Sequence, residues 1–352
     1  MPSQAPMTLV LPTDNDALLR GKPEDFYMFI DRDFEGERTT PWEGGGYGYV
    51  RGPVRAGDRM VLMHFHEGVD IAPLQRDAAG EPIDEVRSIS HGVVVHCSNA
   101  PGASNYGRYL VIKHDWGQGP MYSLYAHLSK IFAQEGEKVE PGTRVALMGH
   151  TGEGIDRRRS HTHLELNLML NAQFDAWHNA NFKDNPNKHG IYNGLNLAGM
   201  DVAALYLARQ GNPSLTVAEF VRTRDAMFRV LVPRKGDLEI LRDYPWLGED
   251  VSTPSPSWEM TFSGGGLPIK IRGATEAVSQ PKASWVKNEG IPVSYHTRGY
   301  VSGSATKFAL TSSGLHYVQL ITGDFSPPPA VAKKTTGKTE SSPAKKKSTK
   351  KS

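Results

Sequence analysis

The sequence predicts a mainly β protein whose central part, residues 59–175, folds as a compact antiparallel sheet or sandwich. Short apolar runs typical of strands recur about every 12 to 20 residues in this region, with no helical periodicity between them. The chain also has 36 glycines and 24 prolines among its 352 residues, which favours many turns over long helices. The expected strands are Met60–Phe65, Gly92–His96, Tyr109–Lys113, Met121–Tyr125, Arg144–Met148 and His163–Leu170.

The remaining segments follow from the same signals. Residues 1–58 have few periodic runs and are expected to form a loop-rich extension. Residues 176–256 are expected to be a loop and helical connector, in which a Thr216/Glu219 capping box begins a helix from 217 to about 231. Residues 257–326 are expected to form a second, small β-rich module with strands at Trp258–Phe262, Leu267–Ile271, Lys307–Leu310 and His316–Ile321.

Composition excludes several classes of protein. A 38% apolar and 22% charged content excludes wholesale disorder. No apolar run of about 18 residues exists that would span a membrane. The single cysteine, Cys97, can form neither an internal disulfide nor a cysteine-based zinc cluster. The first residues lack the basic and apolar segments of a secretory signal.

Residues 327–352 are expected to be a disordered basic tail. Residues 333–352 contain eight lysines, one glutamate and no large apolar side chain, so this stretch cannot bury a core. Such a tail either contacts an anionic polymer or only increases solubility. Because the whole chain has a net charge of +2 and this stretch +7, the rest carries about −5. With no recognisable nucleic-acid-binding module, a specific nucleic-acid partner is not expected.

Two histidine clusters are the candidate functional residues. His161 and His163 flank Thr162 on an expected strand, so both side chains project from one face while Leu164 and Leu166 point toward a core. His66 and Asp70 are also an even number of residues apart. Two imidazoles and a carboxylate are a typical catalytic zinc ligand set, which leaves one position for a water molecule whose pKa falls to about 7. Either His161 or His163 can be the second imidazole of this set.

A third histidine, His127 in Tyr125-Ala126-His127-Leu128, lies between the two clusters and makes the set more specific. In order, the chain contains His66-x-x-x-Asp70, Gly92-Val93-Val94, Asn105-Tyr106-Gly107, Tyr125-Ala126-His127-Leu128, Val139-x-Pro141-Gly142, Met148-Gly149-His150-Thr151-Gly152 and His161-Thr162-His163-Leu164-Glu165. This series resembles the lysostaphin/LytM-type zinc metallopeptidases, which have the duplicated hybrid motif fold. The resemblance covers about a third of the chain.

The resemblance implies a zinc-dependent endopeptidase that hydrolyses peptide bonds of bacterial peptidoglycan, with one Zn²⁺ per chain. It makes His66, Asp70 and His163 the zinc ligands, and His127 and His161 the catalytic pair that is not bound to metal. One of the pair acts as base toward the water and the other stabilises the oxyanion. A peptidoglycan substrate in turn implies a location in the cell envelope or outside the cell.

The loop before the second cluster departs from the family pattern. Eight residues, Glu153–Ser160, separate Gly152 from His161, where the family usually has about five, and they include Arg157, Arg158 and Arg159. Because guanidinium groups pair with carboxylates, these arginines are candidate substrate-binding residues at the rim of the cleft. A solvated arginine run is the alternative.

Two other functions fit the sequence less well. A catalytically inactive relative that regulates a cell-wall hydrolase would have lost ligand residues, whereas all five positions are filled here. A phosphocarrier of the sugar transport system resembles this fold but has no need of the Tyr-x-His and His-x-His motifs. Signatures of a nucleophile elbow, a phosphate-binding loop, a dinucleotide fold or an H-E-x-x-H helix are absent from the sequence.

Overall fold

The computed structural model describes residues 7–28, 33–38 and 40–325, and its centre is a seven-stranded antiparallel sheet. The strand order is β11-β7-β8-β9-β13-β14, and β5 pairs with the first half of β13. The mainly β, antiparallel fold class is therefore confirmed. The strands are β5 (Val69–Ile71), β7 (Gly92–Ser98), β8 (Tyr109–Asp115), β9 (Pro120–Ala126), β11 (Lys138–Val139), β13 (Thr162–Met169) and β14 (Leu197–Met200).

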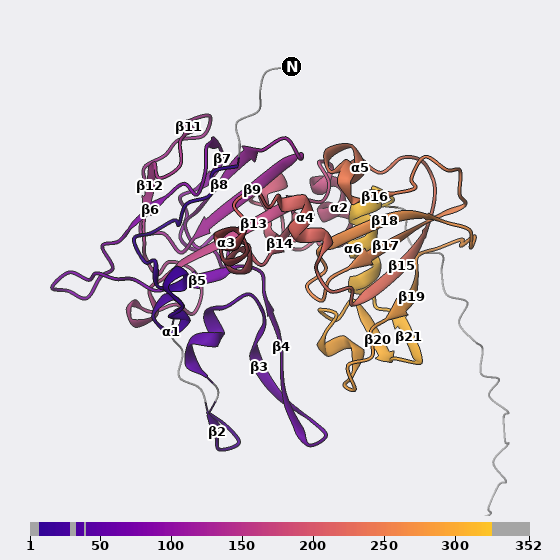
Figure 1. Ribbon diagram of the computed structural model, residues 1–352, viewed down its shortest axis with the longest axis horizontal. Coiled ribbons are helices and arrows are strands. Elements are labelled where there is room, and N and C mark those ends of the chain that lie inside the picture. The colour runs from indigo at the N-terminus through magenta and orange to yellow at the C-terminus, as the bar shows by residue number, and fades with distance from the viewer. Residues whose placement is uncertain (1–6, 29–32, 39, 326–352) are drawn as a thin grey trace, which may run out of the picture.

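Smaller sheets flank this one. A three-stranded sheet consists of β6 (Glu85–Arg87), β10 (Lys130–Ile131) and β12 (Arg144–Leu147), and β1 (Asp33–Phe34) pairs with β2 (Glu37–Arg38). A long hairpin of β3 (Gly48–Ala56) and β4 (Arg59–His66) projects beyond the first sheet (Figure 1). The prediction of loops for residues 1–58 is wrong at β3, because the glycines and Pro53 hid a strand that is stabilised by pairing with β4.

The first lobe (indigo to magenta in Figure 1) packs beside a second lobe (orange to yellow). The second lobe contains a five-stranded sheet in the order β16-β18-β17-β15-β19, in which only β16 and β18 are parallel. Its strands are β15 (Phe228–Pro233), β16 (Gly248–Glu249), β17 (Ser257–Phe262), β18 (Pro268–Ala274) and β19 (Lys282–Val286), with a separate hairpin of β20 (Val301–Ser304) and β21 (Lys307–Leu310). One continuous cluster of buried apolar side chains extends through both lobes.

The helices are short and lie mostly around and between the sheets. They are α1 (Pro23–Phe26), α2 (Phe174–Asn181), α3 (Val202–Gly211), α4 (Val217–Arg222), α5 (Glu239–Asp243) and α6 (Ser312–Thr322). Single 3-10 turns are η1 (Ala17–Arg20), η2 (Pro41–Gly45), η3 (Arg157–Arg159), η4 (Gly190–Tyr192), η5 (Gly194–Asn196), η6 (Pro245–Leu247) and η7 (Val293–Tyr295). Among the described residues, no helix combines the length and the apolar character needed to cross a membrane.

The structure corrects two predictions in the second half of the chain. The capping box of Thr216 and Glu219 is present, but α4 ends at Arg222, and residues 228–231, which were predicted to continue the helix, belong to β15. This apolar run pairs on both sides, with β17 and with β19, and that pairing outweighs the helical spacing. The second sheet thus takes β15 and β16 from the segment expected to be a connector.

The predicted strand His316–Ile321 is instead the C-terminal half of α6. The side chain of Thr311 accepts a hydrogen bond from the amide of Gly314 at the start of this helix, and Gly323 ends it in the left-handed conformation. These end signals outweigh the strand preference of the tyrosine and the β-branched residues between them. The predicted tail, residues 327–352, lies outside the described residues.

Candidate functional site

Strand register brings the two predicted histidine clusters together. His163 on β13 lies directly opposite Asp70 of β5 on one side and opposite Ala126 of β9 on the other. His127 follows Ala126 immediately, and His66 is the last residue of β4, just before the turn at Gly68 that leads into β5. The predicted alternation along β13 is confirmed, because Leu164 and its i+2 neighbours join the hydrophobic core while His163 faces the site.

The three predicted metal ligands converge and are almost completely buried. Asp70 Oδ1 lies 2.9 Å from His163 Nδ1 and 3.1 Å from His66 Nε2, and the two ring nitrogens are 3.0 Å apart. One potential ligand atom from each residue lies within 4.8 Å of the other two. Two imidazole nitrogens and a carboxylate oxygen in this arrangement fit a divalent metal ion.

Hydrogen bonds on the far side of each ring fix which nitrogen faces the centre. His66 donates from Nδ1 to the carbonyl oxygen of Gly46 at 2.7 Å, which leaves Nε2 as the ligand atom. His163 donates from Nε2 to Glu165 Oε1 at 2.8 Å, which leaves Nδ1 as the ligand atom. A partner of this kind behind a ligating imidazole orients the ring and raises its basicity.

The buried Glu165 carboxylate is held in turn by two further donors. Tyr106 donates its hydroxyl to Oε1 at 2.7 Å, and Asn167 donates its side-chain amide to Oε2 at 3.0 Å. Burial raises the pKa of Glu165, but the hydrogen bond and charge of His163 outweigh burial and lower this pKa below its usual value. Glu165 therefore stays ionised behind the ligand.

The site contains an ionised carboxylate, which attracts a cation. Burial raises the pKa of Asp70, yet the neighbouring His161 and His66 lower it well below its ordinary value. Against the lowering effect of burial, hydrogen bonds to Asp70 and Glu165 raise the pKa of His163 to about 10. Without a metal, a proton on His163 Nδ1 therefore occupies the space between the three ligand atoms, and a metal ion has to replace it.

The two predicted catalytic histidines lie beside the triad with their ring centroids 4.6 Å apart. His127 donates from Nδ1 to the carbonyl of Thr151 at 2.9 Å, and His161 donates from Nδ1 to the carbonyl of Arg159 at 2.6 Å. Nε2 of each ring therefore faces the site, where Nε2 of His161 lies 3.4 Å from Asp70 Oδ1. Burial, followed by the charges of His161 and His163, lowers the pKa of His127 well below its usual value, so His127 is neutral at pH 7.

The backbone of His127 is in an unusual conformation. Its φ angle is +62°, a left-handed value that is uncommon for a residue with a side chain. Its amide donates to the carbonyl of Tyr106 at 2.9 Å, and this bond helps to hold the strained conformation. Strain of this kind concentrates at functional sites, where it sets the direction of a side chain.

All five histidine and aspartate positions line one cavity of about 510 Å³, together with residues that the sequence did not single out. Arg51 on β3 contacts Asp70 Oδ2 and donates from Nε to the carbonyl of Gly44 at 2.9 Å. Arg51 was missed because it lies in the glycine-rich stretch expected to be a loop. Asn105 and Tyr106 belong to a motif of the series to which no role was assigned, and Glu67 carried no signal.

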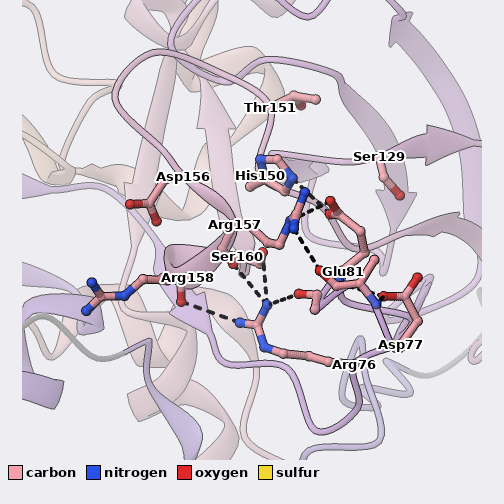
Figure 2. Close-up of polar contacts among 12 residues, drawn as sticks. Arg76, Asp77, Glu81, Ser129, His150, Thr151, Asp156, Arg157, Arg158 and Ser160 are labelled. Carbon is pink, nitrogen blue, oxygen red and sulfur yellow. Dashed lines mark hydrogen bonds and ion pairs between the residues drawn. The ribbon is translucent and has the colours of Figure 1, made fainter.

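The three arginines of the loop before His161 have different surroundings. Arg157 Nε lies 2.7 Å from Glu81 Oε1, and Arg157 also donates to the carbonyl of Ala79, so it is tied to a neighbouring loop (Figure 2). The exposed Arg158 guanidinium points away from this cluster (Figure 2). Arg159 lines the cavity, where it donates to the carbonyl of Gly154 while its Nε is buried without a partner among the described residues.

An antiparallel sheet that presents a buried His–Asp–His group beside two histidines, each held through Nδ1 by a backbone carbonyl, defines a protein with a candidate catalytic metal site. Residues 64–175 match the model of peptidase family M23, and the chain belongs to this family.

Relatives of known name match a minor part of the chain. The peptidoglycan DD-endopeptidase ShyA of Vibrio cholerae is 40% identical over 103 residues, which cover 29% of this chain and 20% of ShyA. Lipoprotein NlpD of Yersinia enterocolitica is 34% identical over 76 residues, or 22% of this chain and 73% of NlpD. The murein hydrolase activator NlpD of Escherichia coli is 32% identical over 81 residues, or 23% of this chain and 20% of the activator. The chain thus spans only a fifth of the endopeptidase.

Two solved structures are also similar. The catalytic domain of lysostaphin from Staphylococcus simulans is 26% identical, with 34% of this chain and 77% of that domain covered and a TM-score of 0.24. A zinc-containing peptidase from Vibrio cholerae is 26% identical, with 40% of this chain and 36% of that chain covered and a TM-score of 0.24. These TM-scores are low, so family membership is supported by the family model and the sequence relatives and not by these two structures.

Proposed function

We propose that the protein is a zinc-dependent metalloendopeptidase that hydrolyses peptide bonds in bacterial peptidoglycan. The observation that carries this proposal is the complete set of groups in one cavity: His66, Asp70 and His163 as ligands, with His127 and His161 beside them. The names of relatives such as the peptidoglycan DD-endopeptidase support the substrate class. The same relatives support a location in the cell envelope or outside the cell.

The zinc ligands, His127 and His161 would have separate roles in peptide hydrolysis. Zinc, held by one nitrogen or oxygen from each ligand, would supply a water of lowered pKa and polarise the scissile carbonyl. His127 is neutral and presents a free Nε2, so it would take the proton from the attacking water. His161 would donate a hydrogen bond to the oxygen on which negative charge develops.

Substrate positioning is assigned to the rim of the cavity. Of the three arginines, Arg159 is the strongest candidate to pair with a carboxylate of the substrate, because it lines the cavity and its Nε has no partner in the described part of the chain. Arg157 and Arg158 would act at most at a distance, since Arg157 is already paired with Glu81 and Arg158 points elsewhere. Arg51 would orient Asp70 through the oxygen that does not face the other ligands.

A second candidate function is that of a murein hydrolase activator. The observation that favours it is the similarity to relatives that bear this name. Such a function needs neither the ligands nor the catalytic histidines. The complete and oriented site in this chain therefore favours hydrolysis.

The test is zinc content by elemental analysis, measured together with muropeptide release from purified peptidoglycan, with and without a chelator. We expect one zinc ion per wild-type chain, and loss of both zinc and release in His163→Ala. His64→Ala is the matched control, because His64 is an exposed residue on the same strand as His66. A wild-type protein that binds no zinc and releases nothing would overturn the enzyme proposal and favour the activator.

A further inference from the structure

The cavity at the metal centre continues into a second cavity of about 440 Å³. Glu67, Asn105 and Tyr106 line both cavities and so form the boundary between them. Beyond this boundary, the second cavity is lined by the loop around Lys188 and by Arg298 from the second lobe. A substrate chain bound across the metal site can therefore extend along this groove without leaving the protein surface.

Arg298 is held firmly at this junction. Its side chain is paired with Glu67, which directly follows the ligand His66, and its amide donates to the hydroxyl oxygen of Tyr49 at 2.6 Å. Tyr49 in turn donates to the carbonyl of Gly264 at 2.8 Å. Arg298 has a left-handed φ of +52°, so the backbone is strained at the point where the second lobe meets the groove.

Two buried histidines in the groove have nitrogens without a partner. His178 on α2 and His189 are 3% and 8% exposed, and Nδ1 of each is buried with no hydrogen bond among the described residues. Buried polar atoms are nearly always paired, so an unpaired one in a cavity wall points to a ligand. His189 Nε2 lies 3.4 Å from the carbonyl of Ala103 and carries the proton toward it, which leaves Nδ1 as an acceptor for an N–H group.

The charged side chains of the groove indicate which charged group the ligand carries besides the N–H group that faces His189. The carboxylate of Glu67 is neutralised by Arg298. Lys188 is exposed at the groove and has no ion-pair partner in the parts of the chain that the structure describes. The free charge is therefore positive, and a carboxylate is the complementary group.

We propose that this groove is a second subsite that binds a carboxylate-bearing stretch of the substrate peptide, with one peptide N–H bonded to His189 and the carboxylate beside Lys188. The second lobe then forms one wall of the substrate cleft. The substrate class rests on the proposed function, whereas the binding itself does not depend on hydrolysis.

The experiment measures binding and hydrolysis separately. The binding probe is a cross-linked dimer of peptidoglycan stem peptides with free carboxylates, compared with the same dimer after amidation. It is titrated by calorimetry into zinc-loaded protein that carries His161→Ala, so that no turnover occurs. In this background Lys188→Glu should weaken binding of the free acid about tenfold and leave the amidated dimer unchanged.

Lys183→Glu is the matched control, because it makes the same charge change at an exposed lysine outside the groove lining. His189→Phe keeps a planar ring but removes the acceptor, so it should weaken both dimers. Equal affinities of the Lys188→Glu and Lys183→Glu proteins for the free acid would overturn the subsite. If Lys188-dependent binding is found but wild-type protein releases no muropeptide, the subsite stands and the enzyme proposal fails.

Discussion

Replacing Glu165 with glutamine tests whether the carboxylate behind His163 controls metal binding. The substitution keeps the shape of a side chain that is 1% exposed but removes its charge. The hydrogen bond from His163 Nε2 at 2.8 Å becomes a neutral one, which costs about 1 kcal/mol. Glutamine also has one acceptor oxygen where the carboxylate serves Tyr106 and Asn167 on separate oxygens, so one more hydrogen bond worth about 1 kcal/mol is lost.

The charge removed from behind His163 predicts a zinc affinity about 10- to 100-fold weaker than that of the wild type, whereas the bond lost to Asn167 lowers the stability of the fold with or without metal. Competition with a chelator of known affinity measures this loss, and urea unfolding of the metal-free proteins separates it from a loss of fold. Glu140→Gln is the control, since Glu140 is an exposed carboxylate away from the cavity. An affinity of Glu165→Gln within twofold of the wild type would refute the role assigned to Glu165.

Three further outcomes follow from the same structure. Because the pKa of His163 is about 10 without metal, each zinc ion should displace close to one proton when it binds. The zinc affinity should therefore rise about tenfold for each pH unit between 6 and 8. Calorimetry in buffers of different ionisation enthalpy measures the number of protons released. Burial lowers the pKa of His114 to about 4 from 6.5, so the unfolded chain protonates first as pH falls. Wild-type protein should therefore lose about 2 kcal/mol of unfolding free energy between pH 7 and pH 5 through this residue, and urea titrations of His114→Gln should lack that component. Gly68→Ala would place a Cβ atom 2.3 Å from the carbonyl oxygen of Leu164, so it should lower the melting temperature and weaken zinc binding, both read from thermal unfolding with and without zinc.

The parts of the site that are formed by residues close together in the sequence were predictable. A period of two through His161 and β13, which begins at the next residue, places His161 and His163 on one face, and the motif series identifies the strands on either side. The resemblance was needed to choose His163 over His161, because both rings face Asp70 Oδ1, with His163 Nδ1 at 2.9 Å and His161 Nε2 at 3.4 Å.

The unpredicted parts depend on long-range contacts. Arg51 reaches Asp70 only because β3 pairs with β4, and Arg298 reaches Glu67 across 231 positions of sequence. Neither residue belongs to a periodic pattern. Local signals also conflicted in the second lobe, where an apolar stretch with helical spacing became β15 because strands were available on both of its sides.

The last prediction concerns the dependence of the metal site on the second lobe. Because the two lobes share one apolar core, and because Tyr49 on the hairpin that carries His66 is bonded to Gly264, we expect a chain that ends at residue 227 to lose its zinc affinity. Buried polar contacts would be lost as well, among them the bond from Asn171 Nδ2 to the carbonyl of Leu320 at 2.8 Å. Elemental analysis of the purified fragment, alone and after co-expression with residues 228–352, measures the effect. Restored zinc binding on co-expression would show that the second lobe positions the site, whereas a fragment that binds zinc as tightly as the whole chain would show that the first lobe is sufficient.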